Sequence, residues 1–171
     1  MKVKTRRSKN GSRNWTVYGY GINVDKINTT PEKVCKFIKN NVCLSEEETI
    51  KNIINEYDEM KKMHPDKDIS NDFWEMFNDY EDSDYNCAKG LTALIIRYLN
   101  EKYERIYFQW VGDDYNSGSP FILFEASLPW QLSEDEKTLT TEKLDEIYKE
   151  CLSHLEEKPQ TPDYYEIEQY G

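Results

Sequence analysis

The sequence predicts an α+β fold: a single domain in which an antiparallel sheet of about three strands is packed by four to five helices. The order of patterns supports this, because one strand precedes four helical segments, two further strands and a last helix. The length of 171 residues suits one domain, and no internal repeat is visible. We expect a flexible basic arm at 1–13, the α+β domain at 14–156 and an acidic, Tyr-rich tail at 157–171.

The first strand is expected between Trp15 and Val24, a segment rich in β-branched and aromatic residues. Gly19 and Gly21 within it indicate a bulge or a close approach of another backbone. Thr30-Pro31 then begins a helix, because a hydroxyl side chain can cap its first turn and Pro is tolerated at its first position.

The second helix is expected to begin at Ser45, which with Glu48 forms a capping box, and to end before Pro65. A shorter helix then places Phe73, Met76, Phe77 and Tyr80 on one side. The most apolar helix is predicted at 85–102. Its apolar residues cover more than half of the circumference, so we expect it to be the central buried helix.

Two strands are predicted after this helix, at Tyr103–Val111 and Phe121–Ser127, joined by a longer hairpin loop with Gly, Pro and Asp. The last helix is expected from about Thr140 to Leu155. The core draws on large aromatic residues, since the chain holds 13 Tyr, 6 Phe and 4 Trp although its hydrophobic share is only 37%.

Charge is distributed unevenly along the chain. The net charge is −11, but residues 1–13 carry six basic residues and no acidic one. The remainder therefore holds 16 basic against 33 acidic residues, a net charge of −17. Such a body repels nucleic acid and anionic membranes and attracts a basic groove. The alternative is that the charge only keeps the protein soluble, and that the basic arm is a solvated tail.

The four cysteines, Cys35, Cys43, Cys87 and Cys151, form no C-x-x-C pair and lie in apolar helical patterns. We expect them to be reduced and buried, as in a cytoplasmic protein. The chain has no apolar run long enough to span a bilayer and no signal-peptide pattern, and its mean hydropathy is −0.89.

Catalytic and metal-binding motifs are not evident in the sequence. It has no P-loop, no G-x-G-x-x-G and no G-x-S-x-G, and its only histidines are His64 and His154. The acid-rich stretch Asp66–Asp84 fails as a calcium loop, because Asn71 and Phe77 occupy the positions that need Gly and Glu. We therefore expect no cofactor, no metal and no catalytic residue.

Two alternatives remain open. Clustered carboxylates could hold a divalent metal in a hydrolase or nuclease. His64-Pro65-Asp66-Lys67 after a helix resembles the signature of J-domain co-chaperones, in which the preceding helix presents a basic face. Residues 46–63 instead carry six acidic against three basic residues, which is the wrong sign.

Three stretches resemble a group of small, mostly uncharacterised proteins from phages and mobile elements of Gram-positive anaerobes. They are Tyr18–Ile22 with Thr29–Glu32, Leu128–Gln131 with Ser133–Thr140, and Asp79–Glu81 with Gly90–Ile95. The resemblance implies a context rather than a chemistry: the cytoplasm of a bacterial host, where small acidic phage proteins antagonise host defences. Anti-CRISPR inhibitors, many of which imitate nucleic acid with carboxylates, are one such class.

The expected function is that of a non-enzymatic inhibitor or adaptor. Its partner would be a basic surface of a host protein, a nucleic-acid-handling effector, with no direct contact to nucleic acid or membrane; the oligomeric state stays open. Carboxylates would steer association and aromatic residues would anchor it, core packing being the alternative for the latter. The predicted interaction surface comprises Asp79, Glu81, Asp82, Asp84, Asp113, Asp114, Trp74, Tyr80, Tyr85 and Tyr115.

Overall fold

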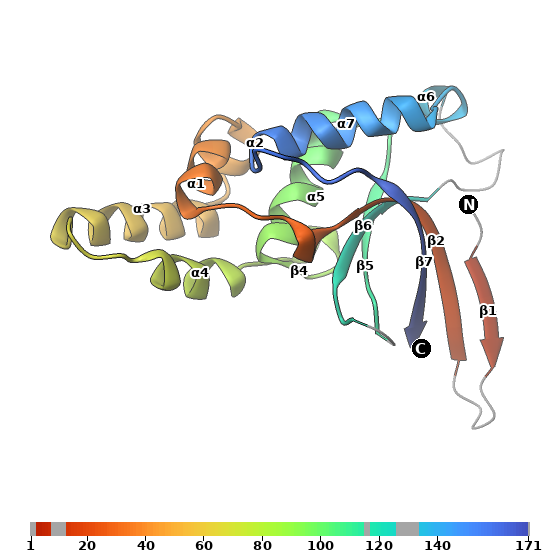
Figure 1. Cartoon of the computed structure of the whole chain (residues 1–171), viewed down its shortest axis with the longest axis horizontal. Coiled ribbons are helices and arrows are strands. Elements are labelled where there is room, and N and C mark those ends of the chain that lie inside the picture. Colours follow the sequence, from red (N-terminus) through yellow and green to blue (C-terminus); the bar gives the residue numbers. More distant parts are fainter. Residues whose placement is uncertain (1–2, 8–12, 115–116, 126–133, 171) are drawn as a thin grey trace.

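A computed structural model describes residues 3–7, 13–114, 117–125 and 134–170, with side chains between residues 15 and 169 of these ranges. The fold is α+β, as the sequence predicts: a curled antiparallel sheet lies beside the helices, and α3 and α4 extend away from it (Figure 1). The helices are α1 (Pro31–Lys39), α2 (Val42–Ser45), α3 (Glu48–Met63), α4 (Ser70–Asn78), α5 (Gly90–Lys102), α6 (Glu134–Lys137) and α7 (Thr141–Ser153), with 3-10 turns η1 (Val24–Lys26) and η2 (Ser83–Tyr85). The strands are β1 (Val3–Arg7), β2 (Arg13–Asn23), β3 (Glu81–Asp82), β4 (Ala88–Lys89), β5 (Phe108–Gly112), β6 (Pro120–Phe124) and β7 (Asp163–Tyr170).

The main sheet has five strands rather than about three, and β2 is its centre. β7 pairs along one edge of β2, while β1 and β6 share the other edge, β1 beside its first half and β6 beside its second. β5 pairs with β6, and β3 and β4 form a separate short ladder. The segments expected to lie outside the domain, at 1–13 and 157–171, thus supply β1 and β7, because β2 is long enough to pair three strands.

The two faces of the sheet carry different cores, since side chains alternate along each strand. The face toward the helices joins the main core through Tyr20, Ile22, Phe108, Ile122 and Phe124. The opposite face forms a second cluster of Val17, Val111, Phe121, Leu123 and Ile167. The sheet curls around this second cluster, and the Gln169 side-chain amide of β7 donates to the Gly112 carbonyl of β5.

Gly19 and Gly21 confirm the predicted close backbone approach. A Cβ atom at Gly21 would stand 1.8 Å from the Ile122 carbonyl oxygen, and one at Gly19 would stand 2.5 Å from Leu123 Cβ. The approach at Gly21 is to backbone, so β6 can pair with β2 there only because Gly21 lacks a side chain, whereas Gly19 leaves room for the Leu123 side chain.

Helix boundaries follow the predicted caps in one case and depart from them in another. Thr30 Oγ1 accepts from the Lys33 amide at 3.3 Å and caps α1, as expected. The capping box at Ser45 is wrong: Ser45 closes α2, and Glu47 caps α3 by accepting from the Ile50 amide at 2.8 Å. The extra short helix α2 uses the residues that separated the two predicted helices.

The α5 helix is the central buried helix, as predicted, with Ala93, Leu94 and Ile95 at most 1% exposed. It begins at Gly90 rather than at residue 85, because Asn86 and Cys87 have positive φ angles of 55° and 57° that a helix cannot contain. Cys87 is therefore exposed, contrary to the expectation that all four thiols are buried in helices. No helix of the described ranges has the length and apolarity to cross a membrane.

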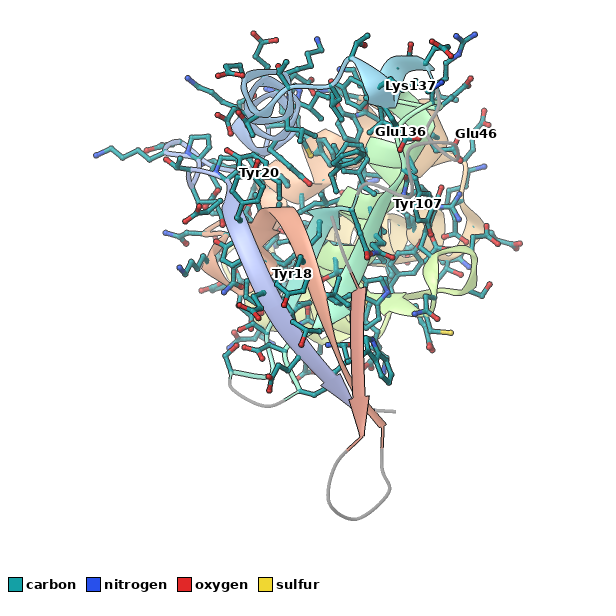
Figure 2. All side chains as sticks on the ribbon, turned by 90° about the vertical axis from the view of Figure 1, so that its right-hand side faces the viewer. Tyr18, Tyr20, Glu46, Tyr107, Glu136 and Lys137 are labelled. Carbon is teal, nitrogen blue, oxygen red and sulfur yellow. The ribbon has the colours of Figure 1, made fainter. Side chains whose placement is uncertain are left out.

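The last helix, α7, is tied to the centre of the sheet. The Tyr148 hydroxyl donates to the Tyr20 carbonyl oxygen at 2.9 Å, and the Tyr20 hydroxyl donates to the Asp145 carboxylate. Figure 2 shows Tyr18 and Tyr20 along β2. The β5 strand begins only at Phe108, later than predicted, where the Asn100 side chain bonds both backbone groups of Phe108 at 2.8 and 2.9 Å.

Candidate protein-interaction surface

The predicted surface residues fall in two regions. Most lie in α4 and in the connection from α4 to α5, whereas Asp113 and Asp114 lie beyond β5 in the turn toward β6. Tyr115 lies outside the described residues. The structure thus brings together residues 74–85 but places the pair of aspartates in a separate turn.

Three of the predicted surface residues are buried: Tyr80 is 3% exposed, Asp82 is 4% exposed and Asp113 is 6% exposed. The prediction that they form part of an interaction surface is wrong. Tyr80 packs in the main core, and each carboxylate is used by internal hydrogen bonds. Acidic composition alone does not reveal which carboxylates are occupied inside the fold.

Asp82 is held by a side chain that the sequence does not single out, Arg97 on α5. Arg97 donates from Nε to Asp82 Oδ2 at 2.7 Å and from a terminal nitrogen to Asp82 Oδ1 at 3.0 Å. The Tyr80 hydroxyl and the Asp84 amide also donate to Asp82, at 3.2 and 3.0 Å. Such a bidentate, charge-assisted pair fixes the β3–β4 segment against α5.

Arg97 neutralises more than one carboxylate. Its guanidinium lies 2.9 Å from an oxygen of Asp84 and 3.7 Å from one of Glu101, and it stacks 5.3 Å from the centre of the Tyr85 ring. Its hydrogen bonds to Asp82 raise the pKa of Arg97, and burial raises the pKa of Tyr80, with the neighbouring Asp82 charge adding to that effect. This network is structural, because its charges are satisfied within the chain.

Asp113 organises the β5–β6 turn. Its carboxylate accepts from the Ser117 amide at 3.3 Å and from the Ser117 hydroxyl at 3.2 Å, and its amide donates to the Ser119 carbonyl oxygen at 2.9 Å. Gly118 completes the turn with a φ of +70°, a conformation that suits glycine.

The exposed carboxylates of the predicted set differ in their surroundings. Asp84 pairs with Arg97, and Glu81 lies opposite Lys89 in the β3–β4 ladder. Asp79, at the C-terminal end of α4, is exposed, and no ion pair joins it to another described residue. Of this group, Asp79 is thus the carboxylate most available to a partner in the α4 region.

Asp79 belongs to a row of carboxylates along α4, which we call the α4 acidic face: Asp68, Asp72, Glu75 and Asp79. Helical geometry places Asp72, Glu75 and Asp79 within an arc of about 60°, on the side opposite the buried Phe73 and Phe77, and Asp68 directly precedes the helix. The helical members are separated along the axis by about 4.5 and about 6 Å. The spacing of these acids against Phe73 and Phe77 was available in the sequence and identifies the face.

The α4 acidic face has no internal counter-ion. Within the described part of the chain, no Lys, Arg or His forms an ion pair with any of its four carboxylates. Asp68 accepts from the Ser70 amide at 3.0 Å, which lowers its pKa and keeps it ionised. The face therefore presents a linear array of negative charges to solvent, with spacings of the order found between phosphates of a nucleic acid strand.

The aromatic candidates take intermediate positions. Trp74 is half-buried, with its ring 5.1 Å from that of Phe73, and it also lines a cavity of about 390 Å³. Tyr85 lies beneath the Arg97 guanidinium, and burial raises its pKa. Core packing thus accounts for part of both side chains.

The other sequence candidates are also located. His64, Pro65 and Asp66 are exposed in the connection between α3 and α4. Within the described ranges, no group of three or more His, Cys, Asp and Glu side chains is arranged to hold a metal ion.

Comparison with known proteins identifies no relative: no family model, no curated protein and no solved structure matches the chain. The resemblance to small phage and mobile-element proteins accordingly stays a prediction.

Proposed function

We propose that the protein is a non-enzymatic inhibitor or adaptor that binds a basic surface of a protein partner through the α4 acidic face. The observation that supports this most directly is the row formed by Asp68, Asp72, Glu75 and Asp79 without a paired cation among the described residues. The partner class is a nucleic-acid-handling effector, because a groove that holds a phosphate backbone has cations at similar spacing.

Binding to a basic partner would change the electrostatic energy of the α4 acidic face. In the free protein the carboxylates of Asp72, Glu75 and Asp79 repel one another, since residues three and four apart are neighbours on a helix. A partner's Lys or Arg side chains would relieve this repulsion and accelerate encounter. The Arg97 network would contribute rigidity rather than contacts, because it fixes the segment that follows α4.

The biological context of this proposal comes from the sequence resemblance alone. A phage-encoded anti-CRISPR or other anti-defence protein that mimics nucleic acid would act on such a groove in the cytoplasm of a bacterial host. The exposed position of α4, which extends away from the sheet with α3, is compatible with insertion into a groove (Figure 1).

The test uses a photo-crosslinking residue at Glu75 and, as a matched control, the same residue at Glu56 on α3; both positions are exposed. Each protein is mixed with lysate of a CRISPR-bearing bacterium, with and without double-stranded DNA at constant ionic strength. The proposal predicts a crosslinked nucleic-acid-binding protein at position 75 that DNA displaces, and none at position 56. Crosslinks that DNA does not affect, or that are equal at both positions, would contradict it.

A further inference from the structure

A cavity of about 390 Å³ lies beside α4, where η1, α4 and the start of α5 meet. Its wall includes Trp74 and Asn78 of α4, Lys89 of β4, and Gly90, Leu91 and Thr92, the first residues of α5. The cavity thus contains the N-terminal end of the central buried helix. Neither the Arg97 network nor the α4 acidic face accounts for it.

The start of α5 lacks a cap. Lys89 occupies the N-cap position and makes no capping hydrogen bond with its side chain, whereas Thr30 and Thr140 cap α1 and α7. The Gly90 amide is used, because it donates to the Tyr80 carbonyl oxygen at 2.8 Å. The amides of Leu91 and Thr92 fall in the first turn, where an α-helix provides no acceptor for its N–H groups.

Thr92 supplies an independent indication of a ligand. Its side chain lines the cavity although the residue is only 4% exposed, and its hydroxyl forms no hydrogen bond with another described residue. The cavity lining also includes Thr29, whose hydroxyl oxygen is buried and has no hydrogen-bond partner, which is unusual because most buried polar side chains are bonded. A hydroxyl and two amides at one helix end form a set of donors that suits an oxyanion.

Gly90 allows this helix end to reach the cavity. Its φ of +55° turns the chain from β4 into α5, and a Cβ atom there would stand 3.3 Å from the Asn78 Cα atom of α4. Lys89 adds a positive charge at the cavity, which Asp25, also part of the lining, offsets. The helix terminus, with its partial positive charge, therefore determines the preference for an anion.

We propose that this cavity binds the phosphate group of a small phosphorylated molecule with a flat apolar part. The Leu91 and Thr92 amides and the Thr92 hydroxyl donate to the phosphate oxygens, Lys89 adds charge, and the Trp74 ring contacts the apolar part. A phosphate suits this set better than a carboxylate does, because it offers more oxygens to the converging donors. The site is distinct from the α4 acidic face and does not depend on the proposed function.

The test is a titration of ¹⁵N-labelled full-length protein, followed by amide chemical shifts, with inorganic phosphate, adenosine monophosphate and adenosine. We expect saturable shifts of the Leu91 and Thr92 amides with the two phosphates, tighter binding of adenosine monophosphate, and no such shifts with adenosine. Thr92→Val, which keeps the shape of the side chain, should weaken binding about fivefold to tenfold. Thr141→Val, in the first turn of α7, is the matched control and should leave the affinity unchanged.

Several results would overturn the assignment. Absence of saturable shifts at Leu91 and Thr92 with either phosphate would exclude the site, as would equal affinity of Thr92→Val and wild type. Equal affinity for inorganic phosphate and adenosine monophosphate would overturn the role of Trp74. Circular dichroism establishes that both variants are folded, so a lost shift is assigned to the donor and not to unfolding.

Discussion

Among single substitutions of charged residues that are partly exposed to solvent, we predict that Arg97→Ala destabilises the fold most. The substitution removes the two hydrogen bonds that Arg97 donates to Asp82, at 2.7 and 3.0 Å, and leaves a carboxylate that is 4% exposed without a counter-ion. Removing one partner of a buried ion pair costs about 3–5 kcal/mol. Asp84 and Glu101, both within 4 Å of the guanidinium, would then also lose their cation.

The assay is urea unfolding of wild type, Arg97→Ala, Asp82→Asn and the double variant. In thermal unfolding of the same proteins, a loss of about 3 kcal/mol corresponds, for a chain of this length, to a fall in Tm of roughly 6–12 °C. Arg97→Lys keeps the charge but loses the bidentate geometry, so we expect it to recover only part of the loss. Lys149→Ala, at an exposed position of α7, should stay within about 0.5 kcal/mol of wild type.

The double variant separates pairing from packing. If Arg97 and Asp82 act as one unit, the double variant should lose less than the sum of the two single variants, by about 1–3 kcal/mol. An Arg97→Ala protein within about 0.5 kcal/mol of wild type would refute the reasoning. So would strict additivity, because it would mean that the two side chains do not interact in the folded state.

Three further predictions concern the backbone, the thiols and the tyrosines. Gly21→Ala should cost about 3 kcal/mol or more because its Cβ meets a carbonyl oxygen, whereas Gly112→Ala, whose nearest contact is 3.6 Å away, should be close to neutral in the same unfolding assay. With a thiol reagent at neutral pH, exposed Cys87 should react at once and buried Cys151, whose pKa burial raises, only as the protein opens; equal rates would contradict the fold. Burial and the Glu32 hydrogen bond raise the pKa of Tyr57 from 10.0 to about 12, so its contribution to stability is complete below pH 10 and is lost as pH rises toward 12. Thermal melts should show this loss, and Tyr57→Phe should reduce it; an unchanged pH profile in that variant would refute the assignment.

The helical part of the fold could be predicted where the signal lies within the segment itself. The Thr30 cap, the stop at Pro65 and the apolar circumference of α5 are all local, and each was correct. The strand β7 was missed because its partner, β2, is distant in the sequence, whereas β1, which directly precedes β2 along the chain, was missed because its basic residues were interpreted as a solvated arm. In β7 the alternation of Tyr165 and Ile167 toward the second core was concealed by the acidic residues that alternate with them, Glu166 and Glu168.

The candidate site was predictable in its region but not in its members. Arg97 lies 15 residues from Asp82, and no local rule states which of the neighbouring acids a helical arginine will bind. Buried and exposed carboxylates look alike in composition, so Asp82 and Asp113 were assigned to the surface. The helical spacing of Asp72 and Glu75 relative to Phe73 and Phe77 is the signal in the sequence that places these two acids on the exposed side of α4.

The central claim is that the α4 acidic face binds a basic partner. The most direct measurement is calorimetric titration of the crosslinked partner, at two salt concentrations, with Asp72→Asn/Glu75→Gln/Asp79→Asn and with the control Glu48→Gln/Glu56→Gln/Glu59→Gln. Both triple variants change the net charge equally, and all three control positions lie exposed on α3. The account predicts that the α4 variant loses affinity and most of the salt dependence while the α3 variant keeps both. Equal losses in the two variants would reduce the effect to net charge, and unchanged binding by the α4 variant would contradict the claim.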